Sequence, residues 1–489
     1  MGIKINRHCE RSEAIQPGLL CRRCLLAMTI IIINVLAACT VGPDYVRPTT
    51  EKPAEFKESK GWKQAQPQDN AIRGKWWEIF NDPELNKLEE QVDISNPNVK
   101  AAEASYRQAR ALVSEARAGY FPTISANVSQ TRSGAGGSTR NGTASSSFGG
   151  VGNFYDAEVD ASWVPDIWGR IRRTVEENKA QAQASAADLG AAKLSAQATL
   201  ATDYLDLRIA DEQKRLLDST VKNYERALQI TENLYKSGVN AQSDVLQAKT
   251  QLESTQAQAV DIGVNRAQLE HAIAILIGKA PADFSIAPVN VVPDLPAIPV
   301  GVPSALLERR PDISGAERRA AAANAAIGVA KAAYFPDLTL TATGGYQSST
   351  LANWFSLPNR VWTIGPQLAE TLFDAGLRKA QTQAAIAAYD QAVANYRQAV
   401  LGGFQEVEDN LAALRILEQE TDMQQHAVTD AQAAAKIFLN QYKSGIVSYL
   451  NVITAQNTEL TNELTALNIR KQRLNAAAAL ITALGGGWK

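Results

Sequence analysis

The sequence predicts a mostly helical protein with a small β part, built as two tandem repeats. Three observations lead to this prediction. Tyr-Phe-Pro follows an alanine-rich helical run at 120–122 and again at 334–336. Tyr-Lys-Ser-Gly occurs at 235–238 and at 442–445, and a long proline-free run precedes each copy. Two fused copies of one unit usually form one architecture repeated around an axis, so we expect two near-equivalent halves.

The spacing of the motifs gives the difference in length between the halves. The offset between the copies of the first motif is 214 (334 minus 120), and the offset between the copies of the second is 207 (442 minus 235). The first repeat therefore carries about seven extra residues, which we place in the Gly/Ser tract from Ser133 to Gly150.

Composition argues against several classes of function. The net charge of -2 does not indicate a basic face for nucleic acid. All four cysteines, at 9, 21, 24 and 39, precede the first repeat, so the body has no thiol for a disulfide, a metal or a nucleophile. No spacing indicates a nucleophile-His pair, a phosphate loop or a metal site. We therefore expect no enzyme, no cofactor and no metal.

The segment 1–38 is predicted to be a signal peptide. Arg22 and Arg23 precede the apolar run from Leu25 to Ala38, which is too short for a membrane span and ends in small residues. Leu-Ala-Ala-Cys, ending at Cys39, resembles the bacterial lipobox, which implies that Cys39 is acylated and becomes the first residue of the mature chain. An uncleaved signal is the alternative.

Residues 39–82 are expected to form an extended, proline-bearing amino-terminal arm. Asp82 before Pro83 predicts a helix N-cap, with helices from about Pro83 to Asp93 and from Pro97 to Gly119. The Trp76–Trp77 pair is interpreted as an anchor that packs the arm onto the body, and a ligand platform is the alternative.

Each Tyr-Phe-Pro is expected to turn a helix into a pair of strands, because Pro122 and Pro336 disfavour helix at the residue before them. The strands are placed at about 121–132, 151–164, 335–347 and 360–372. Apolar and polar residues alternate in the first three, whereas the facing of the fourth, which contains Pro366, is ambiguous. The second strand has one apolar face and one mostly acidic face, formed by Asp156, Glu158 and Asp160.

Four strands cannot close a barrel, and lipid does not tolerate open strand edges. Eight strands would be filled by side chains, so an open lumen needs at least ~12 strands, or three chains. Asp156, Glu158 and Asp160 would then form acidic rings in a pore, with a mild preference for cations. A solvated face on a soluble protein is the alternative.

Two runs, from about Trp168 to Tyr235 and from about Asp374 to Tyr442, predict helices of roughly 67 residues and about 100 Å. Their many alanines allow close helix packing, while a dimeric coiled coil is a weaker alternative because leucines are sparse. The helices should turn back at Gly238 and Gly445. Return helices are expected at about 243–278 and 449–484, and the Pro-rich segment 281–303 is expected to link the repeats.

A family resemblance covers nearly all of residues 39–488. It rests on the order and spacing of several motifs, none of which is specific alone. These are Cys-Thr-Val-Gly-Pro-Asp-Tyr at 39–45, Trp-Trp-Glu-Ile-Phe-Asn-Asp-Pro-Glu-Leu at 76–85, Asn-Pro-Asn at 96–98 with Arg-Arg-Pro-Asp at 309–312, both Tyr-Phe-Pro turns, and Leu-Gly-Gly-Gly-Trp at 484–488. The sequence resembles the TolC/OprM-like (NodT-type) outer-membrane factors, which are outer-membrane lipoproteins of RND efflux systems.

The resemblance implies efflux repeats at 83–280 and 304–489 and a lipid-anchored homotrimer whose 12-stranded outer-membrane barrel continues as a helical barrel in the periplasm. The implied function is a passive exit duct for small molecules that docks onto a periplasmic adaptor and an inner-membrane pump. The alternatives are a structural lipoprotein with coiled-coil arms and no pore, and the outer-membrane duct of a type I secretion system.

The resemblance also implies that the hairpin tips form a closed periplasmic aperture. Members of the family commonly carry acidic residues after the second glycine, but Asn451 and Thr454 are neutral here. Asp244 keeps an acidic position after the first glycine, and Leu450 stands where some members have an apolar ring. We therefore expect a gate formed by Leu450 and Asp244, with weaker cation binding than an all-carboxylate ring.

Overall fold

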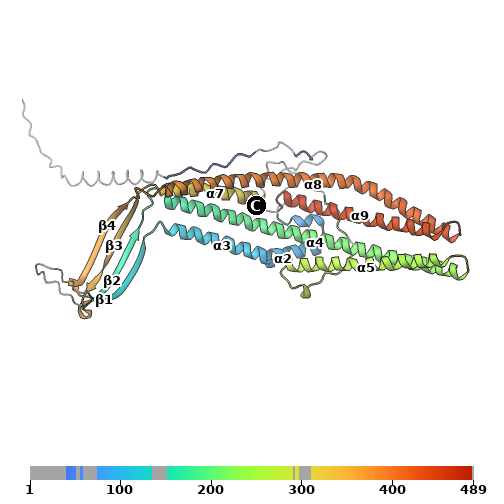
Figure 1. Cartoon of the computed structure of the whole chain (residues 1–489), viewed down its shortest axis with the longest axis horizontal. Helices are drawn as coiled ribbons and strands as arrows, with labels where there is room; N and C mark the ends of the chain where they lie inside the picture. Colours follow the sequence, from blue (N-terminus) through green and yellow to red (C-terminus); the bar gives the residue numbers. More distant parts are fainter. Residues whose placement is uncertain are drawn as a thin grey trace, which may run out of the picture. The chain divides into compact units, whose positions relative to one another are not determined.

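The computed structural model describes residues 40–50, 56–58, 74–134, 151–289, 292–296 and 310–486. The predicted signal peptide, Cys39 and most of the Gly/Ser tract lie outside these residues. The described chain divides into two compact units. The sheet unit contains the residues up to Tyr45, Val113–Asn178 and Ala323–Tyr389, and the helical unit contains Val46–Leu112, Lys179–Ala322 and the residues from Asp390. Figure 1 labels their elements.

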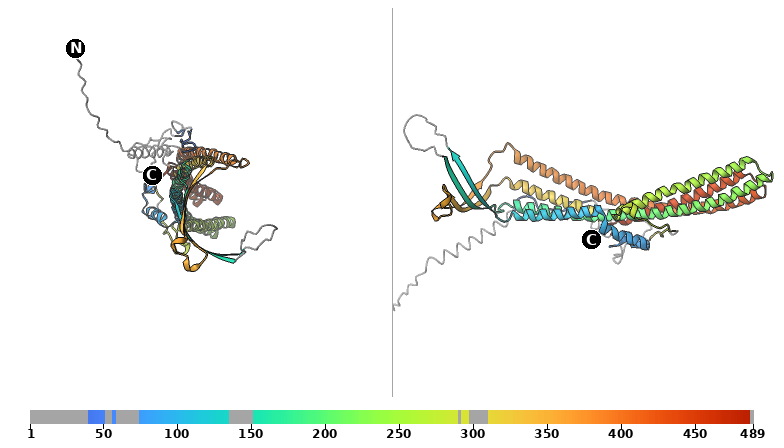
Figure 2. Two further views of the ribbon diagram at one scale, coloured as in Figure 1. Left: turned by 90° about the vertical axis from the view of Figure 1, so that its left-hand side faces the viewer. Right: turned by 90° about the horizontal axis from the view of Figure 1, so that it is seen from below.

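The sheet unit contains four antiparallel strands in the order β1-β2-β3-β4. They are β1 (Thr123–Gly134), β2 (Val151–Trp163), β3 (Asp337–Ser348) and β4 (Arg360–Ala369), and they form a curved sheet (Figure 2). All four predicted strands are present. The last ends at Ala369 rather than near 372, and β2 and β3, from different repeats, pair with each other.

The register determines the facing of the fourth strand. Ile124, Ala161, Ala342 and Ile364 form one row across the sheet, and the adjacent row is Ser125, Asp160, Thr343 and Thr363. Directly paired residues point to the same face, so β4 follows the alternation of the other strands. Pro366 does not interrupt β4, because it pairs in register with Leu340 and the pairing continues on both sides of it.

The helices repeat with matching lengths. Both α4 (Arg170–Lys236) and α8 (Leu377–Lys443) have 67 residues, and both α5 (Gln242–Leu276) and α9 (Tyr449–Ala483) have 35. The remaining α-helices are α2 (Pro83–Ser95), α3 (Pro97–Ala118) and α7 (Pro311–Ala332). Short 3-10 helices are η2 (Trp76–Phe80), η3 (Pro281–Asp283), η4 (Leu351–Asn353) and η5 (Leu357–Asn359). Every long predicted helix is confirmed to within three residues of its expected ends. No helix in the described ranges is long and apolar enough to cross a membrane.

The turns after α4 and α8 have one geometry. Gly238 has φ 72° and Gly445 has φ 71°. Val239 N donates to Leu234 O, and Ile446 N donates to Gln441 O, both at 2.9 Å. This pattern, with glycine in the left-handed region, is a Schellman helix end, and it confirms the predicted hairpin turns.

The core of the helical unit includes the tryptophan pair. Trp76 and Trp77 are buried with an edge-to-face ring contact of 6.1 Å, and both pack in the same apolar cluster as Phe80 and Leu85. Asp82 caps α2, because its Oδ1 accepts from the backbone N–H of Glu84 and Leu85. The pair is therefore a packing anchor, as predicted.

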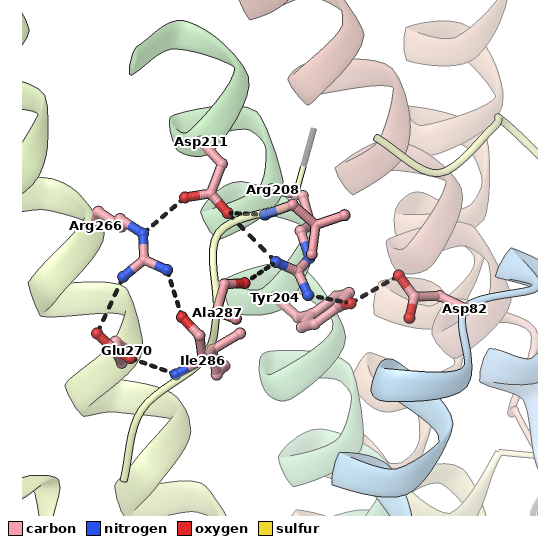
Figure 3. Close-up of polar contacts among 9 residues, drawn as sticks. Asp82, Tyr204, Arg208, Asp211, Arg266, Glu270, Ile286 and Ala287 are labelled. Atoms are coloured by element: carbon pink, nitrogen blue, oxygen red, sulfur yellow. Dashed lines mark hydrogen bonds and ion pairs between the residues drawn. The ribbon is translucent and has the colours of Figure 1, made fainter. Parts of the chain in front are cut away.

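Polar contacts fasten the segment after α5 to the long helix of the first repeat. Asp211 binds Arg208 at 3.3 Å and Arg266 at 2.7 Å (Figure 3). These two arginines donate to the backbone carbonyls of Ala287 and Ile286, respectively. The carboxylate of Asp211 therefore holds both arginines against the start of the inter-repeat segment.

The second repeat uses the equivalent position for a different segment. Arg415 corresponds to Arg208 at the offset of 207 (415 minus 208). It binds Glu58 of the amino-terminal arm at 2.7 Å. Equivalent positions therefore hold the inter-repeat segment in one half and the arm in the other.

Candidate functional site

One face of the sheet is a continuous apolar surface. Its members alternate along all four strands: Ile124, Ala126 and Val128 on β1, Tyr155, Ala157, Val159, Ala161 and Trp163 on β2, Leu338, Leu340, Ala342 and Tyr346 on β3, and Trp362, Ile364, Pro366 and Leu368 on β4. Ile124 and Ile364 are 72% and 73% exposed. A soluble single chain does not normally expose so many large apolar side chains together, so this face is built to contact something apolar.

The other face of the sheet carries the predicted acidic residues together. Thr343 Oγ1 donates to Asp160 at 2.7 Å, and Gln347 Nε2 donates to Glu158 at 2.6 Å. Asp156 pairs in register with Gln347 and is only 8% exposed. This is less exposure than we expect for a side chain that faces an open lumen. Residues of β3 thus fix the orientation of the acidic side chains on β2. Their role as a pore lining stays a prediction.

The sheet has two unpaired edges in the described chain. β1 pairs only with β2, and β4 pairs only with β3. An apolar face with open edges cannot lie in lipid until other strands satisfy those backbone groups. In lipid, this sheet would therefore need further strands beyond the four of the described ranges.

The junctions between helices and strands are rigidly built. Pro122 and Pro336 directly precede β1 and β3, as predicted. Trp168 stacks on Phe335 at 4.9 Å, and its Nε1 donates to Pro336 O at 2.8 Å. Trp163 Nε1 donates to Tyr120 O at 3.0 Å. The sequence analysis missed both indole contacts, although the tryptophans just before α4 were the available signal.

The start of the described chain is seated in the same unit. The buried Arg173 guanidinium donates to Asp44 at 2.9 Å and to Val41 O at 3.2 Å. Gly42 has φ 102°, and a Cβ there would lie 2.5 Å from the Cα of Gly328. Only glycine therefore allows this close approach of the arm to α7. Thr40 packs against Gly169, so the residue after Cys39 lies beside the start of α4.

The predicted gate residues lie at the start of the return helices. Asp244 is half-buried in the first turn of α5, and Leu450 is 58% exposed in the first turn of α9. Asn451 and Thr454 are exposed, and Thr454 Oγ1 donates to Leu450 O at 2.9 Å. Their role as a gate stays a prediction.

A contact that the sequence analysis missed joins the two hairpin tips. Tyr442 is buried, its hydroxyl donates to Thr231 Oγ1 at 3.2 Å, and it accepts a hydrogen bond from the Asn240 amide. Its ring lies 5.1 Å from that of Tyr449. Burial raises the pKa of the Tyr442 hydroxyl, so it stays protonated and able to donate. We call these residues, together with Ala248 and Val452 of the same cluster, the tip latch.

In the described ranges, no three His, Cys, Asp or Glu side chains are grouped so that they could hold a metal ion.

Comparisons with known proteins agree across nearly the whole chain. A family model described as outer membrane efflux protein matches residues 88–279 and 302–486. The probable outer membrane lipoprotein SilC of Salmonella typhimurium is 29% identical over 474 residues, covering 95% of this chain and 99% of SilC. The probable efflux pump outer membrane protein TtgC of Pseudomonas putida is 30% identical, covering 95% of each chain. The solved outer-membrane channel OprN is 30% identical with a TM-score of 0.85, covering 92% of this chain and 100% of OprN.

Proposed function

The chain belongs to the outer membrane efflux protein family, and from this membership we propose that three copies form the outer-membrane exit duct of a tripartite efflux system. The observation that carries the proposal is the sheet, with one apolar face, one polar face and two unpaired edges. Four strands from each of three copies give twelve, which is enough for an open lumen. The apolar face then contacts lipid, and the polar face lines water.

The duct conducts small molecules through a water-filled passage and does not convert them chemically. Asp156, Glu158 and Asp160 of each copy form acidic rings inside the barrel and bias the passage weakly toward cations. The repeats, 83–280 and 304–489, supply equal shares of the barrel wall and of the helical hairpins. Transport is passive, and the direction comes from an inner-membrane pump that reaches the hairpin tips through a periplasmic adaptor.

The closed end of the duct is assigned to the hairpin tips. Leu450 and Asp244, near the tip turns at Gly238 and Gly445, narrow the aperture when three copies meet. Asn451 and Thr454 add no charge there. The tip latch supports this assignment, because it holds the two hairpins of one copy together at the height of these residues.

The duct is also proposed to be a lipoprotein, with acyl chains on Cys39. The seat of Thr40–Tyr45 supports this, because Arg173 and the Gly42–Gly328 contact fix the arm beside the helix-to-strand junction. A junction that enters lipid at Pro122 and Pro336 puts the acylated residue at the inner surface of the same membrane. Cys39→Ala is expected to abolish labelling by a radioactive or clickable palmitate analogue, and continued labelling would contradict the assignment.

Single-channel recording in planar bilayers tests the duct. The purified protein should give small, steady conductance steps in its closed state, and Leu450→Ala with Asp244→Ala should raise them several-fold. Val260→Ala with Asp261→Ala, which removes one exposed apolar and one exposed acidic side chain of α5 away from the tip, is the matched control. Unchanged conductance in the double variant would place the gate elsewhere, and no conductance in any variant would contradict the duct itself.

A further inference from the structure

The β3–β4 connection, residues 349–359, has an unusual composition for a loop. It carries no charged side chain and contains two aromatic residues and two leucines. Phe355 is 67% exposed and Leu357 is 77% exposed. The sequence of the β1–β2 connection, by contrast, is rich in glycine and serine, as expected of a loop in water. The β1–β2 connection therefore has a composition suited to water, whereas the β3–β4 connection has a composition suited to apolar surroundings.

The aromatic residues of this connection lie on the apolar face of the sheet. Trp354 lies 5.5 Å from the ring of Tyr155, and Phe355 lies 5.6 Å from the ring of Tyr346. Trp354 and Phe355 stack on each other at 5.0 Å. The register puts Tyr155 and Tyr346 on the apolar face, in line with Ala157. The connection thus folds outward over that face, continuing it beyond the strand ends.

Several polar groups of the connection are paired locally. Trp354 Nε1 donates to Tyr346 O at 3.2 Å, and Thr350 N donates to Ser348 Oγ at 3.1 Å. Asn359 N donates to Ser356 O at 3.0 Å, and the Asn359 amide donates to Asn353 O at 2.7 Å. Polar groups that are paired within a segment can leave water at low cost. This bonding suits the headgroup boundary of a membrane.

We propose that residues 349–359 are a lipid anchor, which embeds Phe355, Leu357 and Leu351 in the outer leaflet instead of covering the mouth of the channel. The inference rests on the proposed duct, because the occupant is the lipid that the apolar face of the sheet already contacts. Amphipathic aromatic rings are favoured at membrane interfaces, where one side is apolar and the other is wet. The stacked Trp354–Phe355 pair fits that boundary.

Spin-label accessibility in vesicles of phosphatidylethanolamine and phosphatidylglycerol tests the anchor. Single labels are placed on Leu357→Cys, on Trp362→Cys in the apolar face, and on Asn127→Cys in the polar face. All native cysteines precede Thr40, so the unsubstituted chain serves as the blank. The Leu357→Cys label should match Trp362→Cys, with high collision rates with oxygen and low rates with a water-soluble nickel chelate.

Two outcomes overturn the proposal in distinguishable ways. If Leu357→Cys behaves like Asn127→Cys while Trp362→Cys remains in lipid, the connection is a water-exposed lid or a protein contact. If Trp362→Cys is itself accessible to the nickel chelate, the duct fails and the anchor fails with it.

A second measurement separates an anchor from a lid without relying on a label. In the background of Leu450→Ala with Asp244→Ala, where the tips no longer limit the current, Phe355→Ser combined with Leu357→Ser should leave single-channel conductance unchanged, because an anchor outside the barrel does not obstruct flow. An increase of twofold or more would show that the connection covers the mouth, which contradicts the proposal.

Discussion

The turns after α4 and α8 share a backbone but differ in their surroundings. Gly238 and Gly445 adopt nearly identical φ values, and the same hydrogen bonds close both helix ends. Tyr235 of the first turn is 44% exposed, whereas Tyr442 at the equivalent position is 4% exposed. The local motif thus determines the turn, and the partner hairpin determines which tyrosine is buried. The tip latch is built around the tyrosine of the second repeat.

Alanine substitution should destabilise the tips far more at Tyr442 than at Tyr235. Tyr442→Ala should lower the free energy of unfolding of the tips by about 3 to 5 kcal/mol, because it removes a buried ring and its hydrogen bonds. The tips should loosen, and single-channel conductance should rise. Tyr235→Ala removes an exposed ring and should change either quantity little. Equal effects of the two substitutions would contradict the difference in burial between the two tyrosines.

The glycines should behave alike, in contrast to the tyrosines. A Cβ at Gly238 or Gly445 meets nothing within 4 Å, so alanine is disfavoured only by the left-handed backbone. Each Gly→Ala substitution should lower the local free energy of unfolding of its tip by about 1 to 2 kcal/mol. Hydrogen exchange at the two tips measures this, and clearly unequal costs at the two glycines would mean that their backbones are not equivalent.

The return helices differ at Glu459, whose equivalent at the offset of 207 (459 minus 252) is Leu252. Burial, and then the neighbouring carboxylate of Glu463, raise the pKa of Glu459 to about 7. The groove around it also contains Arg226, Lys436 and Lys443.

A raised folded-state pKa adds stability at low pH that is lost as the pH rises from about 4.5 to about 7. Glu459→Leu should therefore raise the melting temperature at pH 8 more than at pH 4. Because Glu459 is half-buried, we expect the substitution to change the free energy of unfolding by about 1 kcal/mol between these pH values, less than the full pKa shift would give. Glu459→Gln is the control of matched size, and an effect of Glu459→Leu that is independent of pH would contradict the assignment.

Removing only the hydroxyl of Tyr442 should have the least effect on stability. Tyr442→Phe keeps the buried ring and removes the hydrogen bonds to Thr231 and Asn240, which should cost about 1 kcal/mol or less. Thermal unfolding should report this modest loss. A loss as large as that of Tyr442→Ala would mean that the hydroxyl, not the ring, holds the tips together.

The sequence predicted the features that depend on local pattern. The lengths of α4, α8 and the return helices follow from the proline-free runs and from the turn glycines, which act within a few residues. The facing of β4 could not be read from its own sequence, because Pro366 interrupts the alternation. Pairing with β3 resolves it, and pairing is a long-range property.

The burial of Tyr442 and the enclosure of Asp156 were not predicted, because both depend on contacts with other segments. The Tyr-Lys-Ser-Gly motif alone does not distinguish Tyr442 from Tyr235. The burial of Tyr442 depends on Thr231 and Asn240 of the other hairpin, and on Tyr449, whose equivalent in the first repeat is Gln242 (449 minus 207). The enclosure of Asp156 likewise depends on β3. The roles of Leu450 and Asp244 depend on contacts between copies and remain predictions.

The central claim is that three copies close one barrel through the free edges of β1 and β4. Cysteines introduced together at Asn127 on β1 and Thr363 on β4, with neighbouring positions to sample the possible registers, should cross-link copies in membranes under mild oxidation. A barrel closed by three copies gives a covalent ladder that ends at three chains. A ladder that ends at two, or that continues beyond three, would contradict it.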